Sequence, residues 1–196
     1  MKKELLISIV LLVSIASAHG QDKPERYVDT KGGFSFDLPR GWQAYEMPNA
    51  KYKVVFGQRE NGFTPNITIE DDACLCPLSE YVDLAQQRFE TNSKKAGFAA
   101  VKLLTKAEFI TSSGQKGWRL TNAGTGSGVS LVFRQYVFSS GDKKQFIFTC
   151  GALAESAARL ESVCDGAMKT LTFAESNAKR VVGAGAGLSS LLSWFD

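Results

Sequence analysis

The sequence predicts an α+β fold in which an antiparallel β-sheet is flanked by two helices. The main observation is the segment 116–150, which has the pattern of a meander of three antiparallel strands. Its middle strand, 129–139, carries apolar residues at both alternating positions, which is typical of a central strand covered on both faces. Two other segments, 77–96 and 155–170, have apolar residues at the three- and four-residue spacing of amphipathic helices.

The first 18 residues have the pattern of a cleaved signal peptide. Lys2 and Lys3 precede an apolar run at 5–15, and Ala16-Ser17-Ala18 supplies the small residues that signal peptidase recognises. The run is shorter than the ~20 residues that span a bilayer, so a retained membrane anchor is the disfavoured alternative. No cysteine follows the run, so we expect no lipid anchor. The protein is therefore predicted to be periplasmic or secreted.

The composition points to one globular domain without a catalytic histidine. The chain has 196 residues, 44% of them hydrophobic and 22% charged, and its net charge of +3 is too small to predict nucleic-acid binding. The single histidine, His19, lies at the predicted mature N-terminus. Ser-His-Asp and Cys-His catalysis and histidine-based metal sites are therefore excluded from the folded body. We expect no enzymatic activity, no metal and no cofactor.

The first half of the body has the alternation of short strands. Phe34 and Phe36 fall on one side of a strand at 33–38, and Ile67 and Ile69 fall on one side of a strand at 66–71. Further strands are expected at 27–28, from Trp42 onward, and at 53–59, 98–104 and 108–111.

The first helix is predicted at 77–96, because Pro77 suits a first helical turn and Gly97 a stop. Its apolar stripe could receive a partner, but we expect it to pack on the chain's own sheet. The stripe consists of Leu78, Tyr81, Val82, Ala85 and Phe89.

The second half contains the meander and the second helix. The flanking strands of the meander are expected at 116–121 and 143–150, joined by a Gly-rich loop at 122–128 and a tight turn at 140–142. The extended piece Leu171-Thr172-Phe173 follows the second helix and closes the domain. The body is thus predicted at 27–173, between a flexible lead-in at 19–26 and a C-terminal segment at 174–196.

The start of the body resembles a known family. Gly33-Phe34-Ser35-Phe36-Asp37-Leu38-Pro39-Arg40-Gly41-Trp42 is similar to the opening of PsbP-like and DcrB-like domains of secreted bacterial proteins, an aromatic strand followed by Pro-x-Gly-Trp. The order of elements over residues 27–173 is similar as well. The resemblance implies a PsbP-like α/β/α sandwich and a non-enzymatic role, since members support photosystem assembly, phage uptake, nuclear transport or effector secretion by binding other proteins. No catalytic or ligand residue carries over, because the motif is structural.

The four cysteines, Cys74, Cys76, Cys150 and Cys164, predict disulfides in a secreted chain. Cys164 lies ~14 Å along the second helix from its start, so a Cys150–Cys164 bridge is disfavoured. We therefore expect the loop with Cys74 and Cys76 to be joined to the meander end and the last helix. A four-cysteine zinc site is disfavoured because one residue separates the first pair, and a redox role because Cys-x-x-Cys spacing is absent.

Two other motifs have a structural and a functional interpretation. Gly124-Thr125-Gly126-Ser127-Gly128 could cradle a phosphate, but it lacks the Lys-Ser/Thr of a P-loop, so a mobile hairpin loop is favoured. Glu70-Asp71-Asp72 could hold a cation, but no calcium-loop spacing follows, so a solvated strand end is favoured.

The C-terminal segment carries an amphipathic pattern after a Gly-rich hinge at 183–187. Such an apolar end could dock on a partner, contact a membrane surface weakly, or fold back on its own domain. The candidate contact residues are Leu188, Leu191, Leu192, Trp194 and Phe195.

The function that these features favour is a secreted, non-enzymatic binding module, an accessory or assembly factor of the cell envelope whose partner is another protein. A toxin-neutralising or effector-chaperone role is one alternative. A hydrolase is an alternative of another class, and it would need a carboxylate pair or a Ser-Lys site that the sequence does not display.

Deletion of residues 188–196 tests the role of the C-terminal segment. Because the predicted sandwich is complete by Phe173, we expect the truncated chain to keep its thermal midpoint and to lose part of its envelope association. A large fall in the midpoint would instead show that the segment belongs to the core.

Overall fold

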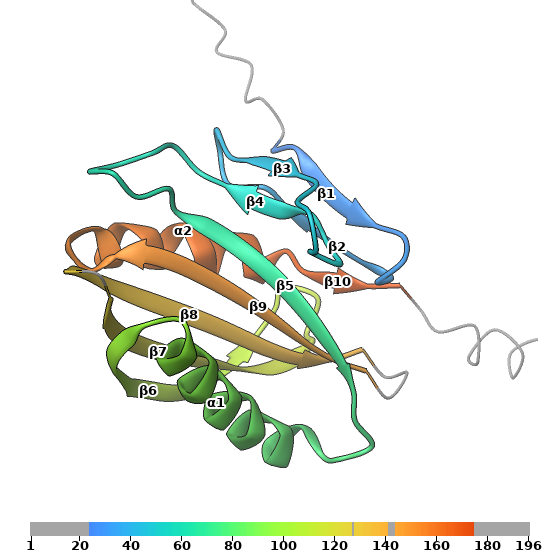
Figure 1. Cartoon of the computed structure of the whole chain (residues 1–196). Helices are drawn as coiled ribbons and strands as arrows, with labels where there is room; N and C mark the ends of the chain where they lie inside the picture. The colour runs from blue at the N-terminus through green and yellow to red at the C-terminus, as the bar shows by residue number, and fades with distance from the viewer. Residues whose placement is uncertain (1–23, 127, 141–143, 175–196) are drawn as a thin grey trace, which may run out of the picture.

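The computed structural model describes residues 24–126, 128–140 and 144–174, which form two antiparallel sheets and two α-helices (Figure 1). The predicted α+β fold with two helices is confirmed. A second, three-stranded sheet was not predicted as a separate layer. It consists of β1 (Arg26–Asp29), β2 (Phe34–Asp37) and β10 (Thr172–Phe173) in the order β1-β2-β10.

The larger sheet has seven strands, and its centre is the predicted meander. All its pairings are antiparallel. In spatial order its strands are β3 (Gln43–Tyr45), β4 (Val54–Phe56), β5 (Asn66–Ala73), β9 (Lys144–Leu153), β8 (Val129–Ser139), β7 (Lys116–Gly126) and β6 (Phe98–Ile110).

One face of the large sheet packs on the small sheet and on α2 (Ala157–Lys169). Phe34 of β2 is the hub of this layer, because its ring lies 5.4 Å from that of Phe146 and 5.3 Å from that of Phe148, both in T-shaped contacts. Such geometry is favourable beyond the area that the rings bury. Helix α2 adds Leu160, Cys164, Ala167 and Met168 to the same core.

The other face packs on α1 (Leu78–Lys95). The predicted stripe of this helix does face the sheet: Tyr81, Val82 and Ala85 are buried against Val137 and Ile147, while Leu78 and Phe89 are half-buried. The expectation that the helix covers the chain's own sheet is therefore confirmed.

Strands β8 and β9 alternate between the two cores. Tyr136 and Phe138 point to the α2 side and Val137 to the α1 side, and all three are 0% exposed. Their neighbour β9 repeats the pattern with Phe146 and Ile147. The prediction that 129–139 is a central strand covered on both faces is confirmed.

Two connections differ from the sequence-based expectation. The residues expected as a Gly-rich loop at 122–128 largely continue β7, which runs to Gly126 because 122–126 pair with β8. The strands expected at 98–104 and 108–111 are a single strand, β6, with register shifts at Phe98/Ala100 and Leu103/Thr105. A bulge lets a strand absorb an irregular apolar pattern without ending.

The expected disulfide pairing is wrong. The bonds are Cys74–Cys76 and Cys150–Cys164, with Cα–Cα distances of 5.3 and 6.5 Å. The error came from treating Cys150 as the end of its strand. Strand β9 continues to Leu153, and the short helix η1 (Ala154–Ser156) reverses the chain, so α2 runs back across the sheet. Cys164 thereby returns to Cys150.

Both helices belong to the globular body, and within the described residues neither is long and apolar enough to cross a membrane. The bounds of both agree with the predicted ones to within two residues at each end. The C-terminal segment, His19 and the predicted signal peptide lie outside the described residues.

The two disulfides should contribute unequally to stability, because a longer closed loop restricts the unfolded chain more. Replacing Cys150 and Cys164 by Ala should lower the free energy of unfolding by about 3 kcal/mol, and replacing Cys74 and Cys76 by about 1.6 kcal/mol. Urea unfolding of the two double variants measures the difference. Equal losses would contradict the loop-length argument.

Candidate binding groove

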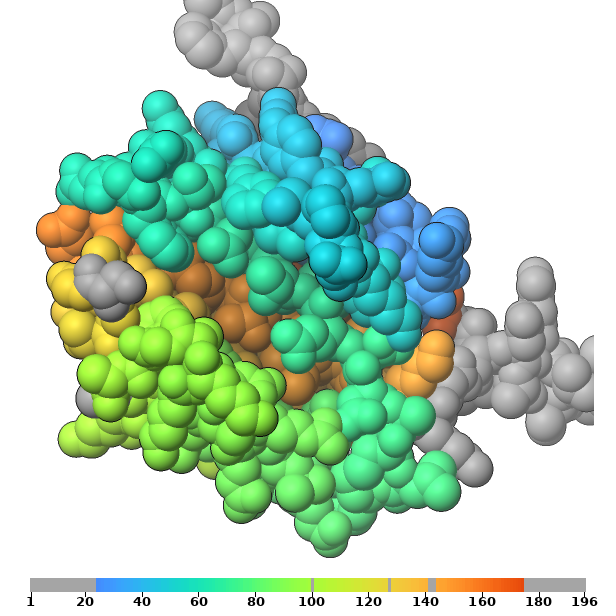
Figure 2. Space-filling view, in the orientation of Figure 1, coloured from blue at the N-terminus to red at the C-terminus, as the bar shows by residue number. Residues whose placement is uncertain are grey.

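A groove of about 620 Å³ lies between α1 and strand β5. Figure 2 shows the orange surface of β9 recessed between the green of α1 and the teal of β5. The groove follows from the position of α1, which packs more closely on β6 than on β9. The part of this face formed by β5 and β9 is therefore left open.

Strand β5 forms the side of the groove opposite α1, and its outer edge, which faces away from the groove, is unpaired over most of its length. Its neighbour β4 pairs with it only at Asn66 and Ile67, whereas β9 pairs with it from Asn66 to Ala73. Within the described ranges, residues 68–73 thus have a strand partner on one side only. Backbone groups on such an edge are free to pair with another extended chain.

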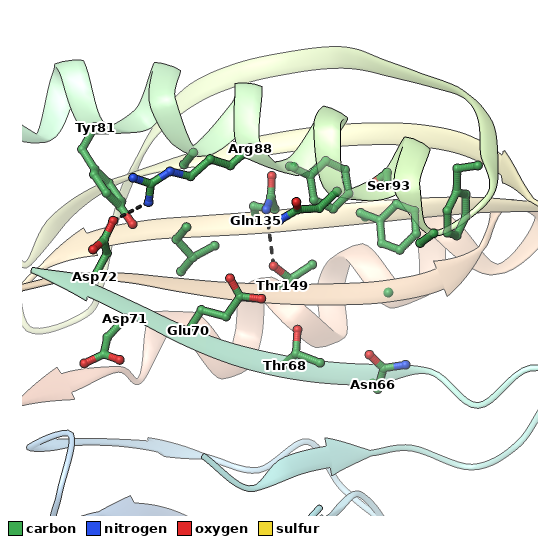
Figure 3. Close-up of a pocket in the computed structure, with 18 residues that line it drawn as sticks. Asn66, Thr68, Glu70, Asp71, Asp72, Tyr81, Arg88, Ser93, Gln135 and Thr149 are labelled. Carbon is green, nitrogen blue, oxygen red and sulfur yellow. Dashed lines mark hydrogen bonds and ion pairs between the residues drawn. The ribbon is translucent and has the colours of Figure 1, made fainter. Parts of the chain in front are cut away.

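Polar side chains form the floor of the groove (Figure 3). They project from alternate positions of β5 and β9, with Thr68 directly opposite Thr149. Gln135 of β8 lies in the same row and donates a hydrogen bond from Nε2 to Thr149 Oγ1 at 3.4 Å. Gln135 is 3% exposed and also accepts from Asn122 Nδ2 at 3.3 Å, so its amide is held in place.

One end of the groove is charged. The carboxylate of Asp72 pairs with the guanidinium of Arg88 on α1, and Glu70 is exposed on the same face of β5. The ring of Tyr81 lies beside this pair (Figure 3). Burial, and secondarily the negative charge of Asp72, raises the pKa of Tyr81 to about 12. Its hydroxyl is therefore a permanent hydrogen-bond donor at neutral pH.

The other end of the groove is aromatic. Phe133 of β8 makes T-shaped contacts with Phe89 of α1 and with Phe98 of β6, at ring-centroid distances of 5.2 and 5.6 Å. All three rings are half-buried, so part of each remains open to a ligand. Gly151 opposite Phe133 has no side chain to fill the floor here. The groove thus joins an apolar end, a polar middle and a charged end.

The three carboxylates of Glu70, Asp71 and Asp72 do not converge. The side chain of Asp71 points away from the groove and is held by Lys51 Nζ at 2.5 Å, as strand alternation requires (Figure 3). Throughout the described ranges, no cluster of three or more His, Cys, Asp or Glu has the geometry to hold a metal ion. The glycines expected to form a mobile loop, Gly124 and Gly126, lie in β7 instead.

A second polar cluster anchors α2 to the large sheet. Asp165 accepts hydrogen bonds from Tyr136 Oη and Arg119, and Arg134 Nη2 lies 2.5 Å from Glu161 Oε2. Two cations and two carboxylates balance one another, and burial next to Asp165 raises the pKa of the Tyr136 hydroxyl. The cluster is self-neutralised, which fits an anchor better than a ligand site.

The groove was not predicted from the sequence, although strand β5 carries a polar pattern that indicates it. In β5, polar residues alternate with apolar ones, so one face of the strand is polar: Asn66, Thr68 and Glu70 against Ile67 and Ile69. The strand is paired on both sides at its start. That face cannot be distinguished from a solvent-exposed one until α1 is placed over part of it. The cysteines do meet in pairs, but they contribute no side chain to the groove.

No family model and no curated protein matches the sequence, but solved structures do. The cyanobacterial PsbP protein CyanoP of Synechocystis sp. PCC 6803 has a TM-score of 0.58 and 17% identity, covering 81% of this chain and 98% of its own. PA94 of Pseudomonas aeruginosa, described as a protein of unknown function and a putative regulator, has a TM-score of 0.53 and 17% identity, covering 78% and 99%.

A third similar structure is LpqN of Mycobacterium tuberculosis, described as involved in cell envelope biogenesis. Its TM-score is 0.51 at 15% identity, and the match covers 80% of this chain and 88% of the other. These likenesses establish the fold: the chain has a PsbP-like fold, as the resemblance implied.

The charged end of the groove gives a test of the geometry. Replacing Asp72 by Asn removes a negative charge that opposes ionisation of Tyr81, so the pKa of Tyr81 should fall below about 12. Titration of the ring-carbon NMR signal measures the shift. Asp83→Asn is the matched control, because Asp83 pairs with Lys106 instead. Equal shifts in both variants would contradict the placement of Tyr81.

Proposed function

We propose that this protein is a non-enzymatic accessory factor of the cell envelope that binds an extended segment of another protein in the groove between α1 and β5. The observation that carries the proposal is the strip of β5 and β9 that α1 leaves uncovered, bordered by the unpaired outer edge of β5. An extended segment laid along this strip can direct alternate side chains into the groove, and the unpaired edge of β5 offers further backbone hydrogen bonds by strand addition.

The composition of the groove supports a polypeptide ligand. Its aromatic end, with Phe89, Phe98 and Phe133, can hold an apolar side chain, while Thr68 and Thr149 offer hydrogen bonds in the middle. Glu70 is exposed and forms no ion pair within the described residues. It would therefore favour a basic side chain at the charged end. Aromatic anchors within a polar surround are characteristic of protein-binding sites.

The same residues make a poor catalytic centre. Asp72 is neutralised by Arg88, and Asp71 points to the opposite face, so Glu70 is left without a second carboxylate to form an acid–base pair. This arrangement favours binding over hydrolysis.

The envelope location draws on two further observations. Disulfides persist in oxidising compartments, and two cysteine pairs at bonding distance are compatible with an extracytoplasmic protein. LpqN, which shares the fold, is described as involved in cell envelope biogenesis. The predicted signal peptide agrees with this location, and the C-terminal residues 188–195 remain a predicted second contact with the partner.

Site-specific photo-crosslinking tests the groove in the cell that makes the protein. A photoreactive residue at Thr68 or Asn92, which face the groove, should yield a discrete adduct with one protein. The same residue at Ser162, exposed on α2, should not. Equal adducts from all three positions would contradict the proposal.

A matched pair of charge variants sharpens this experiment. Glu70→Lys should reduce the adduct at Asn92 by about tenfold, because it replaces the acid that receives a basic ligand. Glu108→Lys serves as the control, because Glu108 is exposed, lies outside the groove and forms no ion pair within the described residues. Both thermal midpoints are recorded, so that loss of the adduct is not mistaken for unfolding.

A further inference from the structure

The two disulfides lie in different environments. Cys150 and Cys164 are 4% and 1% exposed and sit within the core beneath α2. Cys74 and Cys76 are only partly buried and lie in the connection between β5 and α1. The residue between them, Leu75, is 80% exposed, the largest exposed fraction recorded for a large hydrophobic side chain in the described chain.

We propose that Cys74–Cys76 is a thiol–disulfide exchange site that accepts electrons from a dithiol of another protein. Exposed disulfides are the ones that act in exchange, whereas buried ones are structural. The sequence lacks Cys-x-x-Cys spacing, and a redox role was therefore not expected. The structure nevertheless joins Cys74 and Cys76 in a disulfide, and any such pair can be reduced and reoxidised. The inference does not depend on what the groove binds.

The surrounding contacts determine which sulfur is attacked. The backbone N–H of Cys76 donates a hydrogen bond to Cys74 Sγ at 3.2 Å. A thiolate that leaves on Cys74 is therefore stabilised at once by this donor. The sulfur of the partner therefore forms its bond with Cys76 Sγ, and the bond between Cys76 and Cys74 breaks.

The complete step conserves atoms and charge. A thiolate of the partner attacks Cys76 Sγ, the Cys74–Cys76 bond breaks, and Cys74 leaves as a thiolate that is protonated by water. The partner's second thiol loses its proton and attacks the partner sulfur of the mixed disulfide, which releases Cys76 as a thiolate that is protonated in turn. Two electrons and two protons have moved from the dithiol to the cysteines, and the partner carries a disulfide.

The conformation of the loop does not depend on the disulfide alone. Gln145 Nε2 donates to the carbonyl oxygen of Cys76 at 3.4 Å, and Tyr81 N donates to the carbonyl oxygen of Pro77 at 3.0 Å. These contacts hold the C-terminal end of the loop without the disulfide, and the pairing of Ala73 with Lys144 in the sheet holds the other end. With one residue between them, the two thiols remain neighbours after reduction, so the bond can re-form within the chain.

The exposed Leu75 indicates that the reductant is a protein. A small thiol needs only access to the sulfur, whereas a protein dithiol must lay its surface against the loop, and an apolar side chain between the two cysteines provides a contact. Leu84, exposed to 41% on α1, is the matched control position.

Timed reduction of the oxidised full chain tests the proposal, with reduced glutathione and thioredoxin as the two probes. Samples are quenched in acid, alkylated and analysed by peptide mass spectrometry. We expect Cys74–Cys76 to open at least about tenfold faster than Cys150–Cys164 with both probes. The half-reduced protein should stay folded, with a thermal midpoint lowered by only about the few degrees that loss of the short closed loop predicts. If both bonds open together, or the Cys150–Cys164 bond opens first, the exchange site is refuted.

The Leu75→Ser variant tests the nature of the partner. It should slow reduction by thioredoxin several-fold and leave reduction by glutathione unchanged, whereas Leu84→Ser should alter neither rate. Equal thioredoxin rates in all three proteins would contradict a protein dithiol as the electron donor. The Cys74→Ser/Cys76→Ser variant should still form the groove adduct, which separates this inference from the proposed function.

Discussion

Strands β8 and β9 bury side chains on both of their faces, and the positions of the other elements follow from this. Phe138 and Phe148 need cover on one side, and Val137 and Ile147 need cover on the other. A two-sided strand pair is stable in water only between two layers. The small sheet with α2 supplies one layer and α1 supplies the other.

The two layers are not equivalent, and the groove results from the difference. The α2 side is closed by many interlocking aromatic rings around Phe34 and tied by Cys150–Cys164. The α1 side has a smaller core and a single helix, which cannot cover the full width of the sheet. Polar residues on β5, such as Thr68 and Glu70, occupy the uncovered part, so its exposure costs little. A closed, tightly packed layer therefore supports an open one, which is the arrangement that the proposed binding role requires.

Local patterns in the sequence located most of the elements, although 122–126 continue β7 and 98–110 form one strand, but they did not determine the arrangement. The alternation in 129–139 predicted a central strand, and the spacing of Tyr81, Val82 and Ala85 predicted which face of α1 is buried. The pairing of Cys150 with Cys164 could not be predicted from distance along the chain, because the reversal at η1 brings distant residues together. The groove could not be predicted either, since it depends on how far α1 extends across the sheet.

Amide hydrogen exchange along β5 tests most directly whether this half of the sheet is free. In a strand paired on one side, alternate amides point toward the partner and are protected, while the others face outward. We predict that every second amide in residues 68–73 exchanges rapidly, whereas the amides of β8 and β9 exchange only on global unfolding. Uniform protection across residues 68–73 in the isolated protein would show that the edge is already covered, and it would contradict a β5 edge that is open to an extended ligand.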